Sequence, residues 1–107
     1  MKNLEIEFEK DGEVVTEVFS LPERLGAFTA KQAKKSFEKY VSLSFKDGGE
    51  EMLCDKPFSM FEEVGGLIGK SVFKDLDFNV DNLTFAGQVK LVEEYLGDLF
   101  SFNKKKV

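Results

Sequence analysis

The chain has 107 residues, and its 42% hydrophobic and 33% charged residues are typical of one globular domain that buries its own core. The formal net charge of −5, with one dense basic run at residues 104–106, argues against nucleic-acid binding. There is no histidine and only one cysteine, Cys54, so the usual nucleophile–base pairs and most zinc sites are excluded. We therefore expect a protein that acts by contact, with no catalytic, cofactor or metal site.

Hydropathy gives no sign of a membrane protein. No segment approaches the roughly 18 consecutive apolar residues that a membrane-spanning helix needs. The first residues, Met1 to Glu5, lack the apolar stretch that is typical of a signal peptide. A lone cysteine forms no internal disulfide, as is usual in a reducing compartment. We expect a cytoplasmic protein that binds no membrane, with Cys54 as a small core residue.

Phenylalanine is the unusual feature of the composition, with 12 residues against two tyrosines and no tryptophan. Buried phenylalanines give a short chain a substantial core. Several of them exposed together would instead form a patch that binds a partner. The composition favours the first interpretation and leaves the second open.

The first predicted element is a β-hairpin. Apolar residues and glutamates alternate over residues 4–9, residues 10–12 form a turn, and the alternation resumes over residues 14–18. A two-residue loop at Asp11-Gly12 would place Ile6 opposite Glu17. A three-residue loop with Gly12 in the left-handed region would place Ile6 opposite Thr16. We predict the second register because it aligns the apolar positions, although it also sets Glu9 opposite Glu13 and Glu5 opposite Glu17.

A helix is expected next. Thr29 and Gln32 have the spacing of a capping box, with Phe28 placed before it to pack back on the helix. One apolar stripe follows at helical spacing, and lysines occupy the other side. Residues 41–54 allow two interpretations: the helix continues through Leu43, or a second hairpin turns at residues 47–49.

Two further helices are predicted. Ser59 and Glu62 repeat the capping-box spacing at the start of the first, and three glycines at residues 65–69 indicate close packing of a neighbouring element. The second helix follows a cap at Thr84. Its main apolar stripe consists of Phe85, Val89, Val92, Leu96 and Leu99, and a second stripe consists of Leu91, Tyr95 and Phe102.

These elements predict one α+β domain over residues 1–103. An N-terminal antiparallel β-hairpin, with or without a second strand pair, packs on about three α-helices. Residues 104–107 form a basic C-terminal tail.

Two segments match ligand-binding motifs only in part. Residues 64–71 end in Gly-Lys-Ser like a P-loop, but Val64 replaces the first glycine and the preceding residues predict a helix. Residues 75–86 carry the alternate acids of a calcium loop, but Val80 and Ala86 replace its turn glycine and closing glutamate. We expect neither nucleotide nor calcium binding.

The order of elements resembles the small tail assembly chaperones of long-tailed bacteriophages. The resemblance rests on the layout of most of the chain: a charged hairpin over residues 4–18, a helical body, a glycine-containing segment at residues 64–69 and a terminal helix over residues 83–100. It implies a non-enzymatic protein in the host cytoplasm. Such a chaperone binds the long, aggregation-prone tape measure protein and helps the tail tube protein polymerise around it.

The apolar surface of the terminal helix is wider than a core needs. Because the main stripe suffices for the core, we expect Leu91, Tyr95 and Phe102 to lie at the contact surface. The same surface is equally suited to a partner protein and to a second copy of the chain.

Two other function classes stay open. A small acidic regulator would block a host enzyme through protein–protein contact. Its nucleic-acid-like face would consist of Glu5, Glu7, Glu9, Glu13 and Glu17. A carboxylate-based hydrolase would require a deep pocket that holds two acids with opposed pKa shifts.

Overall fold

The computed structural model describes the backbone of residues 1–46 and 49–104 and the side chains of residues 1–42 and 53–97. It confirms the α+β class, with two separate strand pairs and three α-helices. Apart from the backbone of Lys104, the predicted basic tail lies outside the described residues. The elements in chain order are β1 (Lys2–Lys10), β2 (Glu13–Leu21), α1 (Ala27–Tyr40), β3 (Val41–Lys46), β4 (Gly49–Cys54), α2 (Pro57–Val72), the 3-10 helix η1 (Val80–Asn82) and α3 (Phe85–Lys104).

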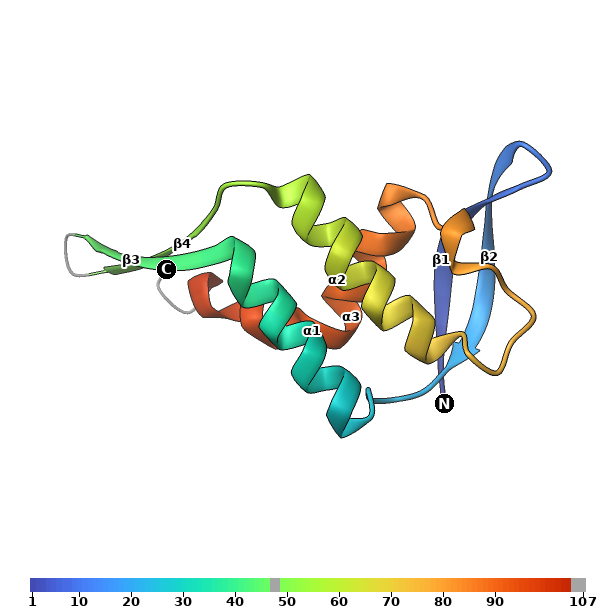
Figure 1. Ribbon diagram of the computed structural model, residues 1–107, viewed down its shortest axis with the longest axis horizontal. Coiled ribbons are helices and arrows are strands. Elements are labelled where there is room, and N and C mark those ends of the chain that lie inside the picture. The colour runs from blue at the N-terminus through green and yellow to red at the C-terminus, as the bar shows by residue number, and fades with distance from the viewer. Residues whose placement is uncertain (47–48, 105–107) are drawn as a thin grey trace.

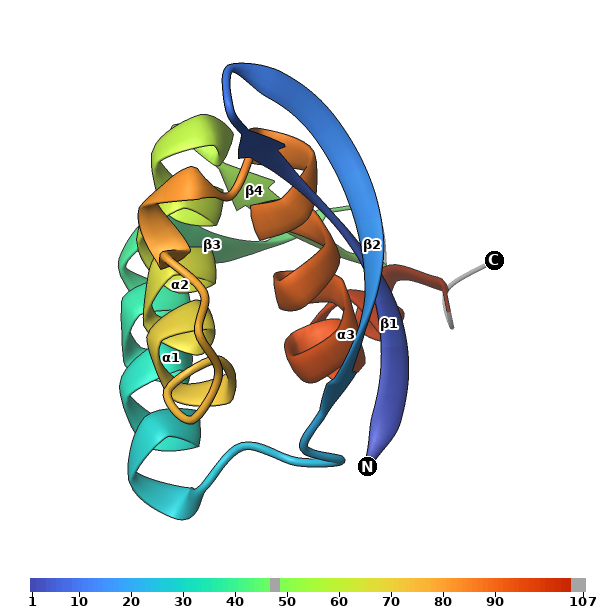
Figure 2. The same ribbon diagram turned by 90° about the vertical axis from the view of Figure 1, so that its right-hand side faces the viewer.

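The two hairpins lie at opposite ends of the molecule, as Figure 1 shows, with the helices between them. The molecule measures 49 × 29 × 24 Å. Figure 2 shows α3 lying between the β1–β2 hairpin on one side and the pair α1 and α2 on the other. The chain therefore forms three layers, and α1 and α2 present an outer surface that no other described element covers.

The core lies where α3 meets the inner face of β1 and the buried stripe of α2. Ile6, Val64, Ile68, Leu91 and Val92 are all fully buried there. Phenylalanine rings close one side of this core through edge-on and stacked contacts. These rings are Phe8, Phe19, Phe73 and Phe78, with centroid distances of 4.4–5.7 Å. Core packing thus accounts for a large part of the phenylalanine content.

The predicted register of the first hairpin is wrong. Ile6 pairs with Glu17, which requires a two-residue loop at Asp11-Gly12. Both loop residues have positive φ, 53° and 81°, as a type I′ turn needs, and this turn matches the twist of the strands. The observed register also removes the opposed glutamates of the alternative, and Glu17 instead forms an ion pair with Lys10 at 3.6 Å.

Strands β3 and β4 pair as the second hairpin, so the alternative of a helix that continues through Leu43 is excluded. Helix α1 ends at Tyr40, and Val41 already has extended dihedral angles of −120° and 133°. β-Branched residues such as valine lose side-chain freedom in a helix and suit a strand. Strand β3 begins there and pairs antiparallel with β4, and Val41 lies opposite Cys54.

Both predicted capping boxes are absent. Helix α1 begins at Ala27, so Thr29 lies inside its first turn, and α2 begins at Pro57, two residues before Ser59. Neither helix has a side-chain hydrogen bond at its N-cap. Proline at the first helical position explains the early start of α2, because the N–H that proline lacks would have no partner there.

Thr84 caps α3 as predicted, and it also joins α3 to β1. Its Oγ1 accepts a hydrogen bond from the backbone N–H of Gly87 at 3.2 Å. The same hydroxyl donates to Oε1 of Glu7 at 2.7 Å. A Cβ on Gly87 would overlap the carbonyl oxygen of Glu7, so glycine permits this close approach of helix and strand.

The glycine segment lies inside α2, where a phosphate-binding loop cannot form. A Cβ on Gly65 would lie 2.8 Å from Cβ of Gln88, and a Cβ on Gly69 would lie 2.8 Å from Val80. The predicted close packing of a neighbour is confirmed for these two glycines. No atom lies within 4 Å of the corresponding position on Gly66.

The acidic segment after α2 forms turns and then η1, in which the side chain of Asn79 accepts a hydrogen bond from the N–H of Asp81 at 3.0 Å. Phe78 points its ring into the aromatic side of the core. Among the described side chains, no group of three or more Cys, Asp or Glu residues is placed to hold a metal ion.

Candidate functional site: an aromatic patch and a basic groove

Three phenylalanines form a partly exposed cluster where α2 and α3 begin. We call Phe58, Phe61 and Phe85 the aromatic patch. The ring centroids of Phe58 and Phe85 are 4.9 Å apart, and those of Phe61 and Phe85 are 5.8 Å apart. Phe58 is 68% exposed and Phe85 is 39% exposed. Contiguous exposed aromatic rings of this kind are typical of surfaces that bind another polypeptide.

The position of the patch follows from the helix starts. Phe58 comes directly after Pro57 at the first turn of α2, and Phe85 comes directly after the cap at Thr84. The core contacts of α3 come about two turns later, at Leu91 and Val92, and those of α2 begin at Met60, on another side of the helix from Phe58. The first-turn rings therefore project beyond the core and meet each other. Sequence reasoning assigned Phe85 to the core and did not single out Phe58.

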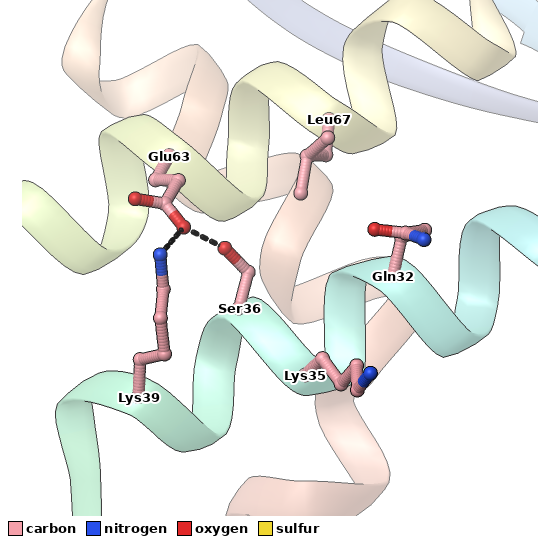
Figure 3. Close-up of a pocket in the computed structure, with 6 residues that line it drawn as sticks. All are labelled: Gln32, Lys35, Ser36, Lys39, Glu63 and Leu67. Atoms are coloured by element: carbon pink, nitrogen blue, oxygen red, sulfur yellow. Dashed lines mark hydrogen bonds and ion pairs between the residues drawn. The ribbon is translucent and has the colours of Figure 1, made fainter.

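A groove of about 540 Å³ opens between α1 and α2 on the other side of α2. Figure 3 shows Leu67 pointing into it from α2, and Lys35, Ser36 and Lys39 lining it from α1. Glu63 of α2 faces Ser36 and Lys39 of α1 across the groove. The groove is open to solvent along the outer surface of the helix pair.

Glu63 is held by three donors from α1. Its carboxylate accepts hydrogen bonds from Ser36 and from the Tyr40 hydroxyl, the latter at 2.8 Å, and it pairs with Nζ of Lys39 at 2.7 Å. The hydrogen bond from Lys39, with those from Ser36 and Tyr40, lowers the pKa of Glu63 to about 2. Glu63 also raises the pKa of Lys39 and of Tyr40, chiefly through the hydrogen bonds it accepts. This network joins α1 to α2.

Glu63 is the only acid among the described residues that line this groove. The pair of acids with opposed pKa shifts that a carboxylate hydrolase requires is therefore not found in it. The arrangement suits a structural ion pair at the edge of a binding surface.

The groove continues as a second hollow of about 270 Å³ toward the start of α1. The two hollows share Gln32 and Leu67. The second hollow is also lined by Phe28, Lys70 and Lys74. Phe28 is 76% exposed, because the early start of α1 turns this ring away from the helix body instead of packing it back as predicted. Together we call the two hollows the basic groove.

The three predicted contact residues have different environments. Leu91 is fully buried in the core, so its expected position at the surface is wrong: α3 has contacts on both of its sides, and Leu91 faces α2 close to Gly69. Tyr95 is half-buried, and its hydroxyl donates to the carbonyl oxygen of Pro22 at 2.6 Å. Burial, with the nearby Glu94 and Glu23, raises the pKa of Tyr95 to about 12. The side chain of Phe102 lies outside the described residues.

The main stripe of α3 is only partly in the core. Val92 and Leu96 are buried, Val89 is half-buried and Phe85 is exposed, whereas the side chain of Leu99 lies outside the described residues. A single helical period could not reveal this, because α3 lies between two layers and is kinked at Leu96, where φ is −123° and ψ is 18°.

The five glutamates of the regulator hypothesis do not share one face of the hairpin. Glu5 lies opposite Val18 on the outer face, whereas Glu13 lies opposite Lys10 on the inner face. Glu17 is paired with Lys10, and Glu7 accepts the hydrogen bond from Thr84. A continuous acidic surface on this hairpin is therefore not formed.

Comparison of the chain with protein-family models, with curated proteins and with solved structures finds no match. In the described part of the chain, none of the helices combines the length and apolar character required to cross a membrane. The function of the protein is therefore inferred from the aromatic patch and the basic groove.

Proposed function

We propose that this protein is a non-enzymatic tail assembly chaperone, which binds the tape measure protein of a long-tailed phage and aids assembly of the tail tube. In this role the protein covers apolar surface of its client until tail tube protein replaces it. The aromatic patch is the observation that carries the proposal, since it is the surface on which a client helix would pack.

The chemistry of the patch supports polypeptide binding. Phe58 and Phe85 keep much of their ring surface in water in the free protein. Burying such rings against a partner stabilises the complex by removing apolar area from water, on the order of 25 cal/mol per Å². A helical client with leucine or valine at every third or fourth position would meet both rings within two turns.

The surrounding charge supports a role in keeping a client dispersed. The net charge of −5 gives each bound copy an acidic exterior, and like-charged complexes repel one another in solution. The resemblance in layout to tail assembly chaperones supplies the identity of the client, and the patch supplies the means of binding it.

Co-expression with a tape measure protein encoded in the same genome tests the proposal. The soluble fraction of the tape measure protein is measured with the wild-type chain and with the double variant Phe58→Ser, Phe85→Ser. We expect the wild-type chain to keep the tape measure protein soluble and the double variant to lose most of this effect.

Val14→Ser, Val18→Ser is the matched control, because both valines are apolar, are exposed at 61% and 62%, and belong to β2 and not to the aromatic patch. This variant is expected to behave like the wild type. A tape measure protein that stays insoluble with the wild-type chain would contradict the proposed function. Equal losses in the two double variants would contradict the role of the patch.

A further inference from the structure

The charges of this acidic protein are segregated. Residues 2–21 contain six acidic residues and two lysines, whereas residues 27–40 contain four lysines and one glutamate. The hairpin formed by the first segment and the helix α1 formed by the second lie in opposite outer layers of the molecule (Figure 2). The surface of α1 is thus a basic region on a protein whose net charge is negative.

Three of the four lysines that line the basic groove lack an ion-pair partner among the described residues, as do several cations elsewhere on the surface. Lys2 and Lys90 each form an ion pair with Glu94 of α3, and Lys10 forms one with Glu17 of β2. Lys39 is paired with Glu63 at one end of the groove. Among the described residues, Lys35, Lys70 and Lys74 have no carboxylate within 4.0 Å. These three groove lysines are therefore free of a local ion pair, although the chain has more acidic than basic residues.

The floor of the groove between these lysines is apolar. Leu67 is half-buried and lines both hollows, and the exposed ring of Phe28 lies at one end. From Phe28 to Lys39 the groove follows α1 over a length of ~17 Å, about three helical turns. A ligand that fills this groove would place apolar side chains against its floor and negatively charged side chains beside the lysines at its rims.

We infer that the basic groove binds an acidic amphipathic helix of a partner protein, in which glutamates or aspartates flank a stripe of leucine-like residues. The partner's apolar stripe packs on Leu67 and Phe28, and its acids pair with Lys35, Lys70 and Lys74. The inference rests on the proposed function for the polypeptide nature of the ligand, and it adds a second binding surface on the side of α2 opposite the aromatic patch.

The same groove suits a nucleic acid less well. A phosphate backbone would gain from the lysines but would leave the apolar floor uncovered, and the overall charge of −5 would repel it. Helix-in-groove binding uses both parts of the surface, since apolar anchors supply affinity and rim charges supply orientation.

Titration of the ¹⁵N-labelled protein with a synthetic peptide tests the inference. The peptide has about 15 residues, enough for a marginally stable helix, with a leucine stripe flanked by glutamates. We expect amide shifts at Gln32, Ser36, Leu67 and Ser71, and weaker binding as the salt concentration rises. A peptide with lysine at every glutamate position, and a single-stranded DNA oligonucleotide, are expected to leave these amides unchanged.

Charge reversal locates the site. Lys35→Glu is expected to lower the affinity for the acidic peptide by about threefold or more. Lys34→Glu is the matched control, because Lys34 lies on the same helix, is exposed and does not line the groove. Circular dichroism checks that each variant is folded. Shifts that map to another surface, an equal loss with Lys34→Glu, or tighter binding of the DNA would each overturn the inference.

These outcomes are separable from a failure of the proposed function. The peptide titration does not involve the aromatic patch, and the solubility experiment with Phe58→Ser, Phe85→Ser does not alter the groove. Loss of client solubility in the patch variant, together with no groove binding, would retain the proposed function and reject the acidic-helix site.

Discussion

Thr84 donates a hydrogen bond from its hydroxyl to the carboxylate of Glu7 at 2.7 Å, across 77 residues of sequence. The backbone N–H of Thr84 also donates to the carbonyl oxygen of Glu7, at 3.4 Å. These bonds attach the start of α3 to the middle of β1. They also fix the direction of the helix whose first turn carries Phe85 of the aromatic patch.

Removing this hydroxyl is expected to destabilise the protein. Thr84→Ala loses both the N-cap of α3 and the bond to Glu7, so we expect the free energy of unfolding to fall by about 1–2 kcal/mol. Thr29→Ala is the matched control, since Thr29 lies inside α1 and caps nothing, and its effect is expected to stay within about 0.5 kcal/mol. Urea denaturation measures both. Equal effects of the two substitutions would contradict the assigned cap.

Two neighbouring glycines in α2 are expected to respond in opposite ways to alanine. Gly65→Ala places a methyl group against Gln88, where backbone atoms also lie within about 3 Å, and we expect a loss of about 1–3 kcal/mol. Gly66→Ala meets open space, so the better helix propensity of alanine is expected to stabilise by up to about 1 kcal/mol. Thermal unfolding of the two variants gives the comparison. A stabilised Gly65→Ala would show that α2 and α3 pack differently.

The register of the first hairpin can be checked with a disulfide. Glu5 and Val18 lie directly opposite each other on the outer face, a spacing that a disulfide can bridge. In a Cys54→Ser background, Glu5→Cys with Val18→Cys is expected to form the bond in mild oxidant and to raise the midpoint of thermal unfolding. Glu5→Cys with Glu17→Cys would bond readily only in the rejected register. Thiol titration distinguishes the two.

The Glu63 network predicts a loss of stability in acid. The pKa of Glu63 is about 2 in the folded protein, against an ordinary value of 4.5. The stabilisation it gives is therefore complete above about pH 4.5 and is lost as the pH falls through about 2. Glu63→Gln is expected to show a smaller decrease in unfolding free energy between pH 5 and pH 2.5 than the wild type. Parallel pH profiles would show that the network does not stabilise the fold.

Tyr95 predicts a loss of stability in alkali. Its pKa is about 12 in the folded protein, against an ordinary value of 10.0. The stabilisation is complete below pH 10 and is lost as the pH rises through about 12, because the unfolded chain ionises first. Tyr95→Phe removes the bond to Pro22, which is expected to cost about 1 kcal/mol at pH 7. It should also flatten the profile between pH 10 and pH 12, which chemical denaturation at each pH measures.

Local sequence patterns identified several elements of this fold, although they left residues 41–54 open. Alternation over residues 4–9 identified a strand, the turn at residues 10–12 identified a hairpin, and Thr84 identified the start of the last helix. Each of these signals depends on neighbours within a few residues, which is the range over which turn geometry, caps and side-chain periodicity act.

The tertiary structure decided which of these residues are exposed. Leu91 and Phe85 belong to the same apolar helix, yet one is fully buried and the other is exposed, because Leu91 packs beside Gly69 in the middle of the molecule whereas Phe85 lies in the first turn of α3. Two lysines of α1, Lys35 and Lys39, line the same groove as Lys74, which follows α2, only because the two helices pack side by side. Such contacts join residues that are distant along the chain, and no local pattern contains the distance between them.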